Sequence, residues 1–208
     1  MFELDNVSDG VEYIRTALHH AILLWTNERN YMSNLESWWR SFVYGPLFDT
    51  AFMFLGDYNI IRSESESTAY KEYSMLYKDI IPGMVKHKVE KVDLAVRTID
   101  NRMDILTGED KPLLASKKAV AETFLKNQER RVVTLDVIER KLPKPKLIQH
   151  FEVFTALWHG NKMTIHCTRK IDKHYFHYEA AQASFPLTAS NFHEFTRLLL
   201  LVLSLKIQ

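Results

Sequence analysis

The chain has 208 residues, of which 27 are Lys or Arg and 26 are Asp or Glu, so its net charge is only +1. Its apolar fraction of 46% and charged fraction of 25% are those of an ordinary globular protein. These values exclude a strongly basic nucleic-acid binder, and no apolar run reaches the roughly 20 residues that a membrane-spanning helix needs. We therefore expect no membrane partner.

Cysteine usage and the first residues predict where the protein works. Cys167 is the single cysteine, so no disulfide can form within the chain, and a reducing compartment is expected. The first residues include acids and lack the apolar core of a secretion signal. The sequence thus predicts a cytoplasmic protein.

Charge is distributed unevenly along the chain. Residues 141–208 hold nine Lys or Arg and four Asp or Glu, a net charge of +5, whereas residues 1–140 have a net charge of −4. This asymmetry predicts that an anionic partner, if there is one, meets the C-terminal part. The alternative is that the two parts complement each other.

Apolar residues recur every three or four positions in the first part of the chain, a spacing typical of helices packed on a core. We predict helices over 8–26, 33–43, 46–55 and 67–80. The polar stretch 57–67 between the last two is predicted to be a loop.

The most regular apolar spacing alternates steps of four and three and predicts a long helix with a narrow coiled-coil-like seam. Residues 107–110 are predicted to form a turn, and Pro112 to open a second helix that ends before Pro143. Residues 84–142 are thus expected to form a long antiparallel helical hairpin that docks on a partner or on a second copy. The predicted interface residues are Val85, Val89, Val92, Val96, Ile99 and Met103.

The pattern changes to β after residue 147. Residues 150–158 and 163–169 are rich in β-branched and aromatic residues and flank Gly160 and Asn161, which suit a tight turn. Further strands are expected at 174–178 and 184–187, followed by a final helix. The predicted fold is α+β and mostly α: a helical region over 1–142, then a small antiparallel meander plus helix over 147–208, possibly with one shared core.

This ββββα order, with its Phe-Pro-Leu and Phe-x-x-Leu-Leu ending, resembles in outline the PUR-like and related families of single-stranded nucleic-acid binders. The resemblance covers about sixty residues and implies a sheet that contacts single strands. Basic and aromatic residues are interleaved there, as stacking on single strands requires. The candidate nucleic-acid-binding residues are Lys144, Lys146, Trp158, Lys162, Arg169, Lys170, Lys173, Tyr175 and Tyr178.

Common catalytic motifs are absent from the sequence, which has only six dispersed glycines and no phosphate-binding loop. His174 and His177 fall on opposite faces of a strand, so we predict no metal site and no cofactor. Arg15 and His20 fit an R-x4-H spacing similar to that of HEPN-type ribonucleases, which implies metal-independent RNA cleavage as a minor alternative.

The sequence alone therefore favours a non-catalytic adaptor or assembly protein, such as a viral accessory protein. It would act through a protein partner or self-association of its helical region. Binding of single-stranded nucleic acid by the C-terminal sheet is the alternative.

Overall fold

A computed structural model describes residues 4–27, 35–53, 58–78 and 90–205. Its centre is a six-stranded sheet whose strands lie side by side in the order in which they occur in the chain. Neighbouring strands are antiparallel, except that β3 and β4 are parallel. The strands are β1 (Tyr58–Glu66), β2 (Lys91–Thr98), β3 (Asp104–Lys111), β4 (Glu152–His159), β5 (Lys162–Ile171) and β6 (His174–Ser184).

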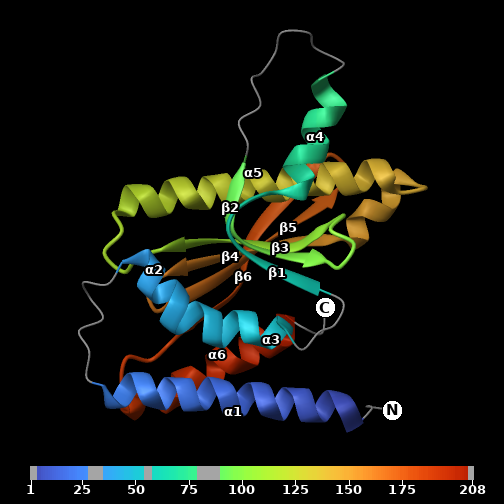
Figure 1. The fold of residues 1–208 in the computed structure, drawn as a ribbon. Coiled ribbons are helices and arrows are strands. Elements are labelled where there is room, and N and C mark those ends of the chain that lie inside the picture. The colour runs from blue at the N-terminus through green and yellow to red at the C-terminus, as the bar shows by residue number, and fades with distance from the viewer. Residues whose placement is uncertain (1–3, 28–34, 54–57, 79–89, 206–208) are drawn as a thin grey trace.

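Helices cover both faces of this sheet (Figure 1). Helix α5 crosses one face as the connection between β3 and β4, and α4 packs against α5. The other face is covered by the α2–η2–α3 run and by α6, with α1 packed on the outside of that layer. The helices are α1 (Leu4–Thr26), α2 (Glu36–Trp39), η2 (Arg40–Asp49), α3 (Thr50–Met53), α4 (Thr68–Lys78), α5 (Lys117–Lys141) and α6 (Phe192–Leu205), with short 3-10 turns η3 (Pro145–His150) and η4 (Ala189–Asn191).

The predicted helical hairpin over 84–142 is wrong. Its first arm is replaced by the β2–β3 hairpin, and only its second arm is helical, as α5. The spacing was ambiguous, because Val92, Leu94 and Val96 also alternate with period two and all three are buried in β2. β-Branched valines favour a pleated strand over a helix, and tertiary pairing on both sides decides the outcome.

The predicted small meander is also wrong, because β4, β5 and β6 extend a sheet that begins in the first part of the chain. The stretch 57–67, predicted as a loop, contains β1, which pairs with β2. Residues 184–187 add no separate strand; β6 already ends at Ser184. Gly45 and Pro46, expected to separate two helices, lie within the π-helical turn η2.

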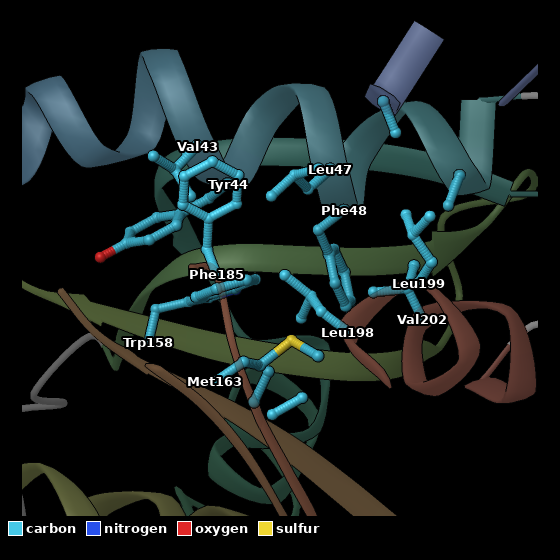
Figure 2. Close-up of a cluster of buried hydrophobic side chains, with 14 of the residues drawn as sticks. Val43, Tyr44, Leu47, Phe48, Trp158, Met163, Phe185, Leu198, Leu199 and Val202 are labelled. Atoms are coloured by element: carbon cyan, nitrogen blue, oxygen red, sulfur yellow. The ribbon is translucent and has the colours of Figure 1, made fainter. Parts of the chain in front are cut away.

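One hydrophobic core lies between the sheet and the helices of the α1–α6 side. Figure 2 shows part of it, with η2 side chains such as Tyr44 and Phe48 meeting Trp158 from β4 and Val202 from α6. The ring centroids of Tyr44 and Trp158 are 4.4 Å apart, in a stacked arrangement. Both 1–142 and 147–208 therefore contribute to the same core. Among the described helices, none is long and apolar enough to cross a membrane.

The turn between β4 and β5 depends on a glycine. Gly160 has φ of +56°, and a Cβ atom there would lie 2.5 Å from Leu113 Cδ1 and 2.8 Å from Leu113 Cα. An alanine would meet both backbone strain and a clash with the chain that follows β3.

We expect Gly160→Ala to lower the free energy of unfolding by about 2 kcal/mol or more. Thermal melts followed by circular dichroism measure this change. Gly10→Ala is the control: nothing lies within 4 Å of its added Cβ in the middle of α1, so the variant should be about 0.5–1 kcal/mol more stable. Equal melting temperatures for the two variants would contradict the expectation.

Candidate active site

Acidic and basic side chains converge where β2 begins and β3 ends. Leu94 of β2 pairs with Gly108 of β3, so the next residues along the two strands, Asp93 and Glu109, are neighbours. Two further residues of β3 and two of the helical run α2–η2 complete the group. We call this group the strand-end cluster: Glu36, Arg40, Asp93, Glu109, Asp110 and Lys111.

Strand alternation sorts these residues by face. Leu94 and Leu106 belong to the hydrophobic core on the η2 side, so Glu109 and Lys111 fall on the face that α5 covers. Glu109 accordingly contacts residues of α5. Asp110 falls on the opposite face, fully buried, where its carboxylate meets Arg40.

The helical run α2–η2 supplies two members of the cluster. Glu36 and Arg40 lie one helical turn apart and form an ion pair of 2.8 Å. The same Arg40 Nη2 lies 3.1 Å from Asp93 Oδ1, while its Nε donates to Asp110 Oδ2 at 2.9 Å. One guanidinium therefore bridges three carboxylates from two strands and a helix.

Tyr44 fixes η2 against the ends of β3 and β4. Its hydroxyl donates to the Gly160 carbonyl at 2.8 Å and lies 3.4 Å from the Lys111 carbonyl. The Lys111 carbonyl also accepts from the Gly160 backbone N–H at 2.8 Å. Arg40 and Glu36 are thus held close to the residues of β3 by the packing of the helix that carries them.

Lys111 occupies the space between two oxygen atoms of its own strand. Its Nζ donates to the Asp110 carbonyl at 2.8 Å and lies 4.0 Å from Glu109 Oε2. The Asp93 Oδ2 accepts from the Asp110 backbone N–H at 3.0 Å. The Lys111 ammonium therefore lies between the Asp110 carbonyl and the Glu109 carboxylate, while Asp93 binds the backbone of Asp110.

Such hard oxygen atoms are the ligands that Mg²⁺ prefers, and Mg²⁺ commonly takes only one or two protein carboxylates together with waters and substrate phosphates. In the part of the chain that the structure describes, no three His, Cys, Asp or Glu side chains are placed to hold a metal ion by themselves. The cluster therefore does not form a closed structural metal site.

Helix α5 adds two cations beside Glu109. Arg130 Nη2 lies 2.8 Å from Glu109 Oε1 and 2.9 Å from Glu90 Oε1, and Lys126 Nζ lies 3.2 Å and 3.3 Å from the same atoms. Arg130 is buried, whereas the Lys126 side chain is 37% exposed. Lys126 therefore reaches solvent at the edge of the cluster while it pairs with both carboxylates.

The surroundings of Glu36 in the cluster disfavour its charged form. Burial and the negative charge of Asp93 raise the pKa of the Glu36 carboxyl, against the opposing effect of Lys111 and Arg40. A carboxyl group whose pKa is raised by folding prefers its protonated form, so its ionisation above the ordinary value of 4.5 lowers stability.

We expect Glu36→Gln to gain stability relative to the wild type as the pH rises from 4.5 to above the folded-state pKa of Glu36. The neutral amide avoids the repulsion from Asp93 while it still accepts from Arg40. Melting temperatures of the two proteins across this pH range measure the difference. A difference that does not change with pH, or that changes in the opposite direction, would contradict the expectation.

Sequence reasoning missed this cluster. The signal that could have revealed it is the two-residue spacing of Glu109 and Lys111, which puts both side chains on one face of a strand. A further acid, Asp93, lies on the preceding strand. This signal was hidden because residues 84–106 were interpreted as a helix and 107–110 as a turn, an arrangement that separates these side chains. Nothing in the sequence around Glu36 and Arg40 indicated that they lie beside residues 93–111.

The predicted nucleic-acid-binding residues fall into several environments. Trp158 is buried in the core, Lys170 is bound to Asp136 and Glu139, and Tyr175 donates to Asp136. Arg169 and Tyr178 both contact Glu152. The exposed cations among the candidates are Lys144, Lys146, Lys162, Lys173 and the paired Arg169.

The structure does not bring all of these together. Lys162 begins β5 and Lys173 follows its end, so the two lie about 30 Å apart along the sheet. Lys144 and Lys146 lie with η3 at the Lys173 end. Lys144, Lys146 and Lys173 thus lie at the end of the sheet away from the strand-end cluster.

The predicted protein-interface residues are also dispersed. Val92 and Val96 are buried in β2, and Ile99 and Met103 are exposed at the turn between β2 and β3. Val85 and Val89 lie outside the described residues.

The HEPN-like pair is not assembled in the structure. Arg15 is 75% exposed and pairs with Glu12. The imidazole Nε2 of His20 instead lies 2.7 Å from the Phe42 carbonyl. Five positions on a helix place the two residues on different sides of α1.

Comparisons with known protein families, with curated proteins and with solved structures found no match.

Proposed function

We propose that this protein is a Mg²⁺-dependent phosphodiesterase that hydrolyses nucleic acid at the strand-end cluster. One observation carries the proposal: Asp93 and Glu109 lie at adjacent strand ends, and the Lys111 ammonium lies 2.8 Å from the Asp110 carbonyl and 4.0 Å from Glu109 Oε2. Metal-assisted phosphoryl chemistry needs oxygen ligands for a hard cation and a cationic side chain next to them. The sequence alone favoured a non-catalytic role, so this proposal differs from that prediction.

The chemistry assigns a role to each group. Asp93, Glu109 and the Asp110 carbonyl would hold the cation, which polarises a phosphoryl oxygen and lowers the pKa of a bound water. Attack of a water oxygen on phosphorus would break the bond from phosphorus to the leaving sugar oxygen. One proton passes from the water to the leaving oxygen, so that a phosphomonoester and a free hydroxyl result.

Positive side chains stabilise the charge that develops in this step. Lys111 is 21% exposed and Arg40 is 23% exposed, so both reach solvent beside the carboxylates. The Lys111 ammonium, which donates to the Asp110 carbonyl, would offset negative charge on the substrate phosphate. Lys126, at the edge, is suited to a neighbouring phosphate of a polymer.

The test is a cleavage assay with the full chain and labelled single-stranded DNA, single-stranded RNA and duplex DNA. We expect cleavage of at least one of these substrates with Mg²⁺ or Mn²⁺ and none with EDTA. Asp93→Asn should abolish cleavage and also the rise in melting temperature that Mg²⁺ produces by binding to the folded state. Cleavage that persists in EDTA, or an inactive wild type that Mg²⁺ does not stabilise, would overturn the proposal.

A binding function is the second candidate, as the sequence predicted. The observation in its favour is an exposed apolar surface on α1, where Val11 is 60%, Ile22 45% and Leu23 46% exposed. Sedimentation velocity at several concentrations tests self-association through this helix, with Val11→Lys and Ile22→Lys as variants. Anisotropy titrations in EDTA, at two salt concentrations, test nucleic-acid binding through Lys144, Lys146 and Lys173.

A further inference from the structure

Strand β6 forms an open edge of the sheet. Among the strands that the structure describes, β5 pairs with one side of β6 and no strand pairs with the other. The side chains at 174, 176–180 and 182 are exposed, so the described helices leave this part of the strand uncovered. An exposed edge presents unpaired backbone N–H and C=O groups, to which a further strand can add.

Few of the features that protect an edge strand from pairing are found in β6. Soluble proteins guard such strands with lysine, proline, short length or bulges. β6 has 11 residues and contains no Lys, Arg or Pro. A bulge leaves Ala180 without a partner in β5, but the residues before it, 174–179, pair continuously. Phe176 and Tyr178 in that stretch are 51% and 43% exposed, so it offers apolar surface to a second strand.

The sequence of β6 is complementary to itself in the antiparallel direction. Residues 174–178 are His-Tyr-Phe-His-Tyr, and residues 180–184 are Ala-Ala-Gln-Ala-Ser. When two copies pair antiparallel, the bulky half of each strand lies along the small half of the other. A two-fold axis pairs one central residue with itself. A centre at His177 or Glu179 sets like groups opposite each other, whereas a centre at Tyr178 sets His177 of each copy opposite Glu179 of the other.

The surroundings of His177 direct a donor outward for that carboxylate. The buried Arg131 of α5 donates from Nε to Thr168 Oγ1 at 2.7 Å, and this hydroxyl lies 2.8 Å from His177 Nδ1. Because the Thr168 oxygen already accepts from the guanidinium, its own hydrogen is directed to Nδ1, and the imidazole carries its hydrogen on Nε2. Burial and the positive charge of Arg131 lower the pKa of His177, which favours this neutral form.

Glu179 of a second copy supplies a negative charge that this region lacks. The Arg131 guanidinium donates to the hydroxyls of Thr155 and Thr168, and no carboxylate among the described residues pairs with it. His177 lies opposite Thr168, and Glu179 is two residues further along the strand, so both side chains fall on the face that α5 covers. The incoming carboxylate therefore accepts from His177 Nε2 and lies on the same face as the buried guanidinium.

We propose that two copies of this chain pair through β6, antiparallel and about a two-fold axis at Tyr178, so that the two sheets become one. His177 of each copy donates to Glu179 of the other. Helix α5 lies on β3, β4 and β5, which leaves the β6 edge accessible. Because the pairing occupies the β6 edge of both copies, assembly through this strand stops at two. The dimer does not depend on the proposed phosphodiesterase activity.

Sedimentation velocity of the full chain over a range of concentrations tests this pairing. We expect a concentration-dependent dimer for the wild type. His177→Glu or Glu179→Lys alone should weaken the dimer at least about tenfold, since each change disrupts both pairs across the axis. The two variants mixed in equal amounts should dimerise to within about threefold of the wild type, because the new glutamate of one then faces the new lysine of the other.

Two controls and a second measurement accompany this test. Lys118→Glu alters an exposed pair with Glu122 on α5, and Val11→Lys alters the exposed surface of α1. Both should leave the dimer unchanged, and melts followed by circular dichroism verify that every variant is folded. In the wild type, hydrogen exchange of the backbone amides of 174–182 should be slower at high than at low protein concentration.

The mixing result identifies the register. Single variants that are weakened and a mixture that dimerises support pairing centred on Tyr178, because no other antiparallel register sets positions 177 and 179 opposite each other. A mixture that stays monomeric, or a dimer that Val11→Lys dissociates and His177→Glu does not, overturns the proposal. A wild type that is monomeric at all concentrations also overturns it and leaves the edge to a strand from a different protein.

Discussion

Replacing Lys111 with Met is expected to slow Mg²⁺-dependent cleavage about 10²- to 10⁴-fold, the range typical of a lost acid–base or charge-stabilising group. The ammonium lies 2.8 Å from the Asp110 carbonyl and 4.0 Å from Glu109 Oε2. Methionine keeps the length of the aliphatic chain and removes the charge.

Single-turnover rates at saturating Mg²⁺ measure this effect, and melting temperatures confirm that the variant is folded. Lys162→Met is the matched control, because Lys162 is exposed at the same end of the sheet and belongs to no part of the cluster. We expect its rate to stay within about twofold of the wild type. A Lys111→Met protein as fast as Lys162→Met would remove Lys111 from the mechanism.

Arg130→Met is expected to lower the free energy of unfolding by about 3–5 kcal/mol, the cost of removing one partner of a buried ion pair. Arg130 is 1% exposed and contacts two nearly buried carboxylates, Glu90 and Glu109. Its Nη1 also donates to Asn127 Oδ1 at 2.7 Å. The variant leaves Glu90 with the partly exposed Lys126, and Glu109 with Lys126 and the more distant Lys111.

Urea unfolding at constant pH measures the loss. Arg102→Met is the control: Arg102 pairs with Asp100 on the surface, where the two side chains are 85% and 52% exposed, and such pairs contribute about 0–1 kcal/mol. Adding Glu90→Gln to Arg130→Met should recover part of the stability, since one uncompensated charge is removed. Loss of less than about 1 kcal/mol in Arg130→Met would show that the buried pair is dispensable.

Local sequence chemistry was sufficient to predict some elements. Gly160 and Asn161 lie between β4 and β5 where a turn was predicted, and the apolar spacing from Val11 to Trp25 lies in helix α1. In each case a turn residue or a periodic pattern specifies the element without help from distant residues.

The strands β2 and β3 needed information that local patterns do not contain. Steps of four and three fit a helix, but the same valines also satisfy a strand buried on both faces, and only pairing with β1 and β4 decides between the two. Because this region was predicted to be helical, the strand-end cluster could not be predicted. The contact of Arg40 with Asp93 and Asp110 joins residues 53 and 70 positions apart, a relationship that no local pattern encodes.

The parallel pairing of β3 with β4 also has a consequence for the order of folding. β1, β2 and β3 pair with their neighbours in sequence, as do β4, β5 and β6, so two antiparallel meanders form from comparatively local contacts. Joining them requires closure of the long crossover that contains α5, and loop closure of this kind is slow. On the ribosome, the Gly160 carbonyl that anchors Tyr44 emerges only after most of the chain has been made. The nascent polypeptide thus lacks the contact that anchors Tyr44 until residue 160 has left the ribosome.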